Sequence, residues 1–435
     1  MNTVNVGVCG LGTVGGGVVA VLRRNADLIT ARAGVHVVIS QIAARRDKPD
    51  IDTQGIAIVR DVFDVARNPD IHILVELIGG TTVARELVLE AIRHGKHVVT
   101  ANKALIAEYG NEIFAAADKQ GVSVCFEAAV AGGVPIIKAI REGLSANRIQ
   151  WLAGIINGTG NFILSEMRSK GRAFNDVLAE AQKLGYAEAD PTFDVEGIDA
   201  AHKLVILASI AFGIPLRFDA VFTEGISRLH IEDIRHADEL GYRVKHLGIA
   251  RRTDAGIELR VHPTLIPAKR LIANVNGVKN AVLVESDAVG PTLYYGAGAG
   301  AEPTASAVIA DIVDVARTLG VDKQHRVPPL GFHAEAISNE PVLSINEVVC
   351  GHYLRMSVLD KPGVLNQITQ VLSRHGISVE ALIQKEPEEG VVTATIIMLT
   401  SRVLEKTLVD VVKAIEAMDS IEGRVVRLRV ENLDG

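Results

Sequence analysis

A short apolar run at residues 4–9 (VNVGVC) leads at once into the glycine-rich turn Gly10-Leu-Gly12-Thr-Val-Gly15 and a helical pattern. A G-x-G-x-x-G turn between a strand and a helix lets the backbone approach a pyrophosphate, whose charge the helix N-terminus stabilises. The motif alone is weak, because a tight strand–helix turn without a ligand has the same pattern. At the start of a strand–helix array, it predicts a dinucleotide site at Gly10, Gly12 and Gly15.

Strand-like and helical segments alternate through the first part of the chain. Further apolar strands are predicted at 35–44, 71–77, 97–101 and 122–127, and helices at 82–94 and 111–120. Apolar strands separated by helices form parallel sheets covered on both faces. We therefore predict an α/β fold that opens with a Rossmann-type parallel sheet, in a domain at residues 1–135.

The remaining chain divides into two further predicted domains. Residues 136–331 mix strands and helices, including a long helix at 304–319 behind a glycine-rich approach. Residues 332–346 are typical of a linker. Residues 347–435 have the order strand, helix, strand, strand, helix, strand, with a turn at 387–390, which predicts a ferredoxin-like domain.

Composition excludes several classes of function. A net charge of -7, a pI near 6.0 and 4% aromatic residues argue against nucleic acid as a partner. The longest apolar run, 204–216, is too short to span a bilayer, and no export signal opens the sequence, so we expect a cytoplasmic protein without a membrane partner. Cys9, Cys125 and Cys350 form neither a metal-ligand pattern nor a disulfide framework, and none is suited to nucleophilic catalysis.

The segment 181–203 (AQKLGYAEADPTFDVEGIDAAHK) concentrates carboxylates ahead of a lysine. Asp199 and Lys203 are four residues apart on an apolar predicted helix at 199–212, so they lie on one side of it. A lysine near carboxylates at the edge of a buried helix is a candidate proton donor or electrostatic clamp. A structural ion pair at a helix start is the alternative.

Two further sites border the predicted sheet. At the end of the second strand, Arg45 stands where an acid would bind the ribose of NAD, and a guanidinium there favours the 2′-phosphate of NADP, with NAD use possible. The alternative is a solvated surface pair of arginines, Arg45 and Arg46. The strand that begins at 97 ends in Thr100-Ala-Asn102-Lys103, at the edge where α/β sheets bind ligands. Lys103 could meet cofactor or substrate there, or merely begin the next helix.

The turn at 127–135 (EAAVAGGVP) consists of small residues and glycines. Its main-chain carbonyl groups could bind a monovalent cation such as Na⁺. A plain hinge between domains is the alternative.

Taken together, these motifs resemble the homoserine dehydrogenase family over essentially the whole chain. The similar segments are GLGTVGGGV, TANKAL, EAAVAGGVPII, INGTGNFIL, GAGAGAEPTASAVIADI and, most specific, A-x3-G-Y-A-E-A-D-P-x2-D-V-x-G-x-D-x3-K at 181–203. The C-terminal domain resembles an ACT domain, with DKPGVL at 360–365 as its first turn and helix start.

The resemblance implies reversible conversion between L-homoserine and L-aspartate 4-semialdehyde with NADP or NAD, in threonine and methionine biosynthesis. It implies an amino-acid effector, threonine, at the ACT domain. It also implies a homodimer or homotetramer that assembles through the catalytic domain.

Residue roles follow by motif. Lys203 would exchange a proton with the substrate oxygen, with Asp199 beside it and Lys103 near the reacting centre. Glu188 and Asp194 would join Asp199 in binding the substrate. Glu188 would bind the ammonium group of the substrate. The cofactor would be bound by the glycines of the turn and Arg45, and also by Thr13, Val14, Thr100, Lys103 and Gly300. Main-chain oxygens of Glu127, Val130, Gly132 and Val134 would form the sodium site.

Two rival hypotheses remain at this point. One is another oxidoreductase of amino-acid metabolism on the same scaffold. The other is a non-catalytic sensor of cofactor and amino acid, against which the set Lys103, Glu188, Asp199 and Lys203 argues. Because the catalytic motifs precede the linker, removal of 347–435 should abolish the threonine response and leave the reaction intact.

Overall fold

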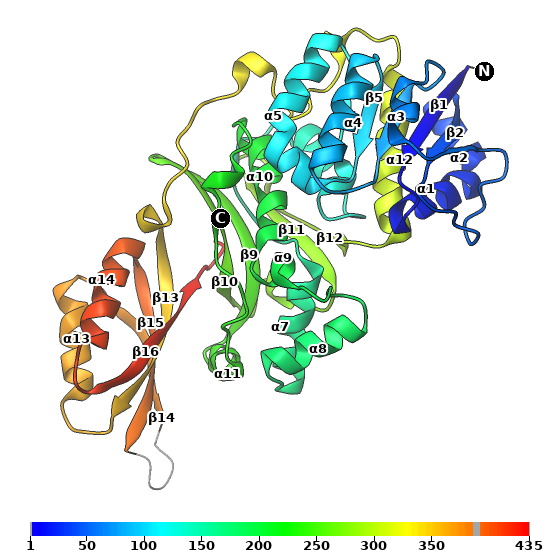
Figure 1. The fold of residues 1–435 in the computed structure, drawn as a ribbon. Helices are drawn as coiled ribbons and strands as arrows, with labels where there is room; N and C mark the ends of the chain where they lie inside the picture. The colour runs from blue at the N-terminus through cyan, green and yellow to red at the C-terminus, as the bar shows by residue number, and fades with distance from the viewer. Residues whose placement is uncertain (1, 386–391, 435) are drawn as a thin grey trace. The chain divides into compact units, whose positions relative to one another are not determined.

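The computed structural model of the protein describes residues 2–385 and 392–434, so the turn predicted at 387–390 lies outside the described residues (Figure 1). The chain forms two compact units. The first unit comprises 1–158, 199–221 and 278–340, and the second comprises 159–198, 222–277 and 341–435.

The first unit contains a six-stranded parallel sheet in the order β3-β2-β1-β4-β5-β6. Its strands are β1 (Thr3–Cys9), β2 (His36–Ala43), β3 (Ala57–Val59), β4 (Ile73–Glu76), β5 (His97–Thr100) and β6 (Val124–Cys125). Its connecting helices are α1 (Thr13–Arg24), α2 (Ala26–Ala33), α3 (Val62–Arg67), α4 (Thr82–Arg93) and α5 (Lys103–Gln120). This strand order is that of the dinucleotide-binding Rossmann fold, which confirms the predicted fold class.

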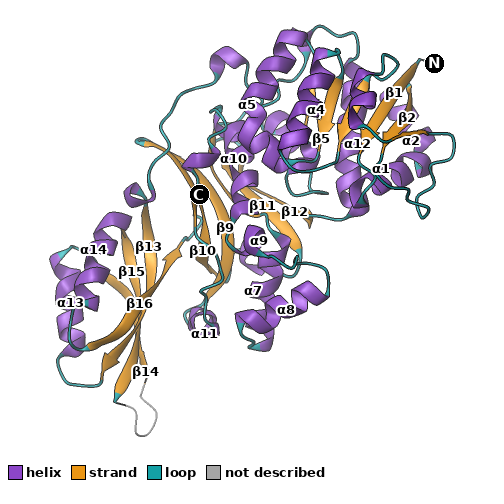
Figure 2. Ribbon diagram, viewed as in Figure 1, coloured by secondary structure: helices purple, strands orange, loops and turns teal. Residues whose placement is uncertain are grey.

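Helix α12 (Ala301–Thr318) completes the core of this sheet from far along the chain (Figure 2). Val308 and Ile312 are fully buried in the same apolar cluster as the β1 and α1 side chains. A Cβ on Gly17 of α1 would lie 2.5 Å from the main-chain oxygen of Ala301, so a glycine is needed where the two helices meet. The hydrophobic core of the first domain therefore draws on residues well beyond 135.

The rest of the first unit carries an antiparallel sheet and a central helix. The sheet has the order β12-β11-β7, from β7 (Ile149–Ile155), β11 (Lys279–Ser286) and β12 (Gly290–Ala297). Helix α10 (Ile198–Phe212) is buried at every residue from Asp199 to Phe212 except Lys203. The predicted apolar helix is thus a core helix that leaves one lysine accessible.

The second unit combines helices with a continuous sheet in the order β9-β10-β16-β13-β15-β14. Its first part contains α7 (Gly158–Lys170), α8 (Phe174–Lys183), α9 (Thr192–Val195), β8 (Phe222–Thr223), α11 (Ile231–Glu239), β9 (Tyr242–Thr253) and β10 (Gly256–Pro267). Its C-terminal part contains β13 (Val349–Leu359), α13 (Val364–Arg374), β14 (Val379–Lys385), β15 (Thr393–Leu404), α14 (Glu405–Glu416) and β16 (Ile421–Val430). That βαββαβ order confirms the predicted ferredoxin-like plan.

Buried ion pairs fasten this C-terminal part to β10. Arg260 is 1% exposed and binds Glu258 at 3.0 Å and Glu431 at 2.5 Å, and β10 pairs with β16 in parallel. Removing residues 347–435 would strip Arg260 of Glu431, and an uncompensated buried charge costs about 3–5 kcal/mol. The prediction that removal of residues 347–435 leaves the reaction intact is therefore at odds with the packing. The C-terminal part and the first part of the second unit share one sheet and one core.

Element boundaries differ from expectation at a few places. The helical pattern predicted after the glycine-rich turn breaks at Asn25, which ends α1 and precedes α2. Helix α5 begins at Lys103 rather than 111, because the Asn102 side chain accepts a hydrogen bond from the Leu105 N–H and caps it. Among the described residues, no helix has both the length and the apolar character needed to cross a membrane.

Candidate active site

Two lysines from different helices converge on Asp199. Lys103 Nζ lies 3.0 Å from Asp199 Oδ1, and Lys203 Nζ donates to Asp199 Oδ2 at 2.6 Å. Lys203 also donates to the Ile156 main-chain oxygen at 2.7 Å, and the Asn157 amide donates to Asp199 Oδ2 at 2.8 Å. The predicted residues Lys103, Asp199 and Lys203 are thus brought into a single cluster.

The electrostatics of this cluster keep Asp199 ionised. Burial by itself would raise the pKa of Asp199, but the charges of Lys203 and Lys103 and the hydrogen bonds from Lys203 and Asn157 outweigh it and hold the pKa well below its usual range. The Asp199 side chain is 5% exposed, whereas those of Lys203 and Lys103 are 12% and 32% exposed. Asp199 therefore orients two ammonium groups. The cluster of one carboxylate and two ammonium groups has a net positive charge, which suits a substrate oxygen that becomes anionic.

Local sequence explains why these side chains meet. Asp199 and Lys203 are in successive turns of α10, and Lys103 is the first residue of α5, directly after β5. The carboxyl ends of parallel strands border the ligand crevice of such sheets. Asn157 was not singled out from the sequence, although it stands in the INGTGNFIL motif.

The glycine-rich turn has the geometry that a dinucleotide needs. Gly10 has a φ of 108°, and a Cβ there would lie 2.6 Å from the Leu77 oxygen. A Cβ on Gly15 would lie 2.2 Å from the Gly10 oxygen, whereas nothing lies within 4 Å of one on Gly12. Gly12 and Thr13 are exposed, and α1 begins without a side-chain cap. The turn can therefore offer its N–H groups to a pyrophosphate.

The predicted NADP determinant lies beside a hollow of about 510 Å³ at the end of β2. Arg46, Ala44 and Leu11 line this hollow, whereas Arg45 is exposed next to it. The 2′-phosphate contact was predicted at Arg45, the first of two adjacent arginines, and Arg46 is the one of the two that lines the hollow.

Thr100 lies at the crevice edge, but its side chain faces inward. It is fully buried, and its hydroxyl donates to Glu76 Oε2 at 2.6 Å and accepts from the Asn102 N–H at 3.0 Å. Gly300 is the N-cap residue directly before α12, has a φ of 129° and is exposed. Any cofactor contact of Thr100 would therefore use its main chain.

The two acidic residues predicted to bind substrate belong to the second unit. Glu188 is exposed in the loop between α8 and α9, where its main-chain oxygen accepts from the Gln182 amide at 3.0 Å. Asp194 lies within α9 and is partly buried.

The predicted cation loop is a buried, curled segment. Ala131 and Gly132 have φ of 54° and 47°, and Val130 is fully buried. The Glu127 carboxylate accepts N–H bonds from Ile137 at 3.0 Å and Lys138 at 2.8 Å, so that side chain is already engaged. Positive φ at a non-glycine residue costs about 1–2 kcal/mol, which marks Ala131 as a position held by its surroundings. Carbonyl oxygens in such a loop are the donors that a hard cation takes.

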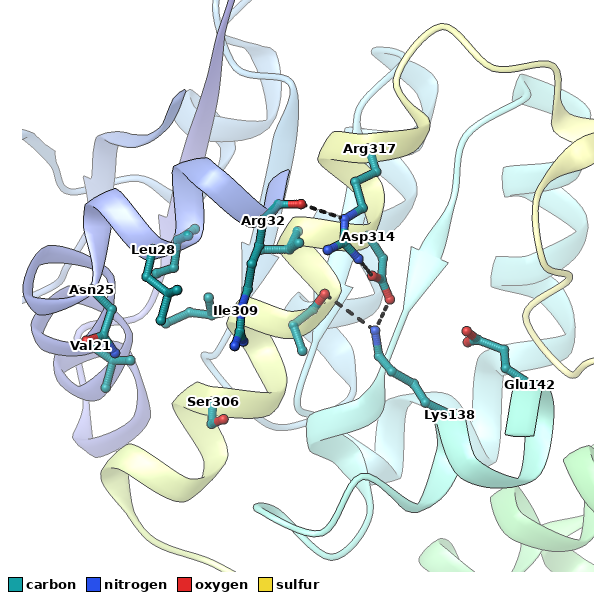
Figure 3. A pocket seen from close by; sticks show the side chains of 13 residues that line it. Val21, Asn25, Leu28, Arg32, Lys138, Glu142, Ser306, Ile309, Asp314 and Arg317 are labelled. Atoms are coloured by element: carbon teal, nitrogen blue, oxygen red, sulfur yellow. Dashed lines mark hydrogen bonds and ion pairs between the residues drawn. The ribbon is translucent and has the colours of Figure 1, made fainter. Parts of the chain in front are cut away.

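A surface groove of about 400 Å³ between α1, α2 and α12 contains none of the predicted site residues (Figure 3). Arg32, Lys138, Asp314 and Arg317 stand at its edge, where Arg317 donates to the Arg32 main-chain oxygen at 3.0 Å. Asp314 pairs with both Lys138 and Arg317 at this edge.

Comparison with known proteins agrees with this geometry. A family model described as "Homoserine dehydrogenase" matches residues 135–313, and one described as "Homoserine dehydrogenase, NAD binding domain" matches 10–127. An ACT domain model matches 352–419. The homoserine dehydrogenase of Pseudomonas aeruginosa (strain PAO1) is 64% identical over 434 residues, covering 100% of both chains. The chain belongs to the homoserine dehydrogenase family.

Solved structures of homoserine dehydrogenases have the same fold. The crystal structure from Thiobacillus denitrificans is 60% identical, covers 100% of this chain and 99% of its own, and superposes with a TM-score of 0.95. A hyperthermophilic archaeal homoserine dehydrogenase in complex with NADPH is 26% identical, covers 73% of this chain and 98% of its own, and has a TM-score of 0.61.

As a homoserine dehydrogenase, the protein is an oxidoreductase that interconverts homoserine and aspartate 4-semialdehyde with a nicotinamide cofactor. Its C-terminal domain is an ACT domain. Membership in this family excludes the sensor hypothesis and the hypothesis of a different substrate.

Proposed function

We propose that Lys203 exchanges the proton of the substrate hydroxyl in this homoserine dehydrogenase, with Lys103 as the second cation at the reacting oxygen. The observation that carries the proposal is the buried Asp199 carboxylate, which binds one lysine on each oxygen. An ammonium fixed in this way can stabilise an alkoxide and deliver a proton to it.

The residues divide the work of the reaction. A nicotinamide cofactor held at the glycine turn would supply the hydride chemistry at the substrate carbon. In the reducing direction, the aldehyde oxygen gains negative charge and Lys203 gives it a proton, which solvent later replaces. Asp199 keeps the ammonium groups in position, and it stays ionised because both lysines lower its pKa. Glu188 and Asp194 are proposed to bind the substrate, Glu188 through the substrate ammonium.

The cofactor assigned to the glycine turn is NADP in preference to NAD. Gly10, Gly12 and Gly15, with Thr13 and Val14, would surround the pyrophosphate, and Arg45 would bind the 2′-phosphate. Lys103, with the main chains of Thr100 and Gly300, would border the nicotinamide. Support for NADP comes from the arginine pair after β2 and from the NADPH complex of the archaeal homoserine dehydrogenase.

Three further features complete the proposed function. The carbonyl groups of Glu127, Val130, Gly132 and Val134 are proposed to hold a monovalent cation, with Na⁺ as first choice. Threonine is proposed to bind the ACT domain and inhibit the reaction, and the enzyme is proposed to be a homodimer or homotetramer. The domain division at 1–135, 136–331 and 347–435, with a linker at 332–346, belongs to the same proposal.

The testing experiment follows absorbance at 340 nm during oxidation of L-homoserine. NADP and NAD are compared, with and without L-threonine, in Na⁺, K⁺ and choline salts. We expect turnover with both cofactors, a lower KM for NADP, suppression by threonine and slower turnover in choline. Equal KM values would contradict the NADP assignment. Turnover indifferent to threonine, or to the replacement of Na⁺ by choline, would contradict the effector or the cation assignment respectively.

A further inference from the structure

Glu76 is a fully buried carboxylate for which the proposed chemistry has no use. It is the last residue of β4, next to β5 in the parallel sheet, and its relative exposure is 0%. Burying a carboxylate is costly unless hydrogen bonds satisfy it. The groups that satisfy Glu76 therefore indicate what it does.

The Glu76 carboxylate is bound by groups at the ligand edge of the sheet. Its Oε1 accepts from the Ile78 N–H at 2.9 Å and from the Gly79 N–H at 3.1 Å. Its Oε2 accepts from the Thr100 hydroxyl at 2.6 Å. One carboxylate thus ties the loop after β4 to the end of β5.

The hydrogen bonds then continue to Asn102 and return to the loop. The Asn102 N–H donates to Thr100 Oγ1 at 3.0 Å, and the Asn102 amide donates to the Gly80 oxygen at 2.7 Å. Asn102 also caps α5, whose first residue is Lys103. These hydrogen bonds therefore form a closed circuit through Glu76, Thr100, Asn102 and Gly80. Asn102 lies one residue before Lys103, the lysine bound to Asp199.

The same loop touches the glycine turn. The Leu77 N–H donates to the Cys9 oxygen at 2.8 Å, and the Leu77 oxygen is the atom that excludes a Cβ from Gly10. Gly79 and Gly80 both have a φ of 71° and are exposed. The circuit thus lies between the cofactor turn and Lys103.

We infer that Glu76 is a positioning residue for this reaction: through Thr100 and Asn102 it fixes the start of α5 and hence Lys103 against Asp199. The inference rests on the proposed role of Lys103. Thr100 transmits the effect because its hydroxyl donates to Glu76 while accepting from Asn102. Valine lacks that hydroxyl, and glutamine at position 76 offers one accepting oxygen where Glu76 uses two.

The test compares Thr100→Val, which keeps the shape and removes the hydroxyl, with Thr100→Ser, which keeps the hydroxyl. A misplacement on the scale of 1 Å can slow catalysis by up to about 100-fold, so we expect Thr100→Val and Glu76→Gln to lower kcat at least about 10-fold. Thr100→Ser should recover most of the kcat that Thr100→Val loses, since it keeps the hydroxyl that the circuit uses. Thermal unfolding of each variant verifies that it is folded.

A second readout does not depend on catalysis. The rate of reductive methylation of Lys103, followed by mass spectrometry on protein without cofactor, should rise in Thr100→Val and not in Thr100→Ser. A lysine that leaves Asp199 becomes more accessible. Unchanged methylation together with unchanged kcat in Thr100→Val would overturn the inference.

Lys103→Met separates the inference from the proposed function. If Lys103→Met is slow and Thr100→Val slows it no further, the circuit acts through Lys103. If Lys103→Met is slow while Thr100→Val alone is as fast as the parent, the proposed function stands and the inference falls. If Lys103→Met is as fast as the parent, the proposed role of Lys103 is wrong and the inference falls with it, whatever the methylation result.

Discussion

His202 and Glu108 form a second link between the helices that carry Lys103 and Lys203: His202 Nε2 lies 3.1 Å from Glu108 Oε1. His202 precedes Lys203 on α10, and Glu108 lies on α5, the helix that begins at Lys103. The His202 ring also stacks on Phe218, with centroids 4.1 Å apart and planes at 9°. We infer that this pair helps to set how α10 is turned toward α5, and therefore which way Lys203 faces.

Replacing His202 tests that link. His202→Phe keeps the stacking on Phe218 and loses the hydrogen bond, so it should lower stability by about 1 kcal/mol and kcat by several-fold. His202→Gln, which can still donate to Glu108, should recover much of kcat. Steady-state kinetics and urea unfolding measure both effects. A His202→Phe enzyme with the parent kcat would show that the pair does not orient Lys203.

Lys203 itself should be indispensable for turnover. Lys203→Ala removes the proposed proton donor, and loss of general acid catalysis typically costs at least about 100-fold in rate. NADPH affinity, measured by fluorescence, should change little, because the Asp199 cluster is expected to act on substrate oxygen. Near-normal kcat in Lys203→Ala would remove it from the mechanism, and Lys203→Arg serves as the charge-retaining control.

Cofactor preference should depend on the arginines after β2. Arg45→Ala should raise the KM of NADP more than that of NAD, because only NADP carries the additional phosphate. Arg46→Ala is the matched variant, since Arg46 lines the adjacent hollow. A selective loss in Arg46→Ala and not in Arg45→Ala would transfer the assignment to Arg46, and equal loss for both cofactors would contradict both.

The ACT domain should lose stability in mild acid. Burial opposes ionisation of Glu405, but His352 and Arg429 lower its pKa from 4.5 to about 2. Because the folded pKa is lower than the unfolded one, the stabilisation is complete above the unfolded value and is lost as pH falls from about 4.5 toward 2.

Urea unfolding between pH 3 and 6 measures this loss. Glu405→Gln should reduce the pH dependence and cost about 3 kcal/mol near neutrality, since Arg429 would lose a buried partner. Glu380→Gln, at an exposed position of β14, is the control and should behave as the parent does. An identical pH dependence in Glu405→Gln would show that this pair does not govern acid stability.

The sequence by itself determined the local chemistry of this protein. The glycine turn at Gly10, the four-residue spacing of Asp199 and Lys203, and the βαββαβ order after residue 347 are local patterns, set by backbone geometry and helical periodicity. Such patterns can be read directly, and the fold and the family followed from them.

Only the tertiary structure decided which distant groups meet. It joined Lys103 to Asp199, gave Glu76 its partners, brought α12 into the first domain's core and tied the ACT domain to β10 through Arg260 and Glu431. The physical reason is that long-range pairing depends on packing and on the satisfaction of buried charges. Neither quantity is fixed by spacing along the chain.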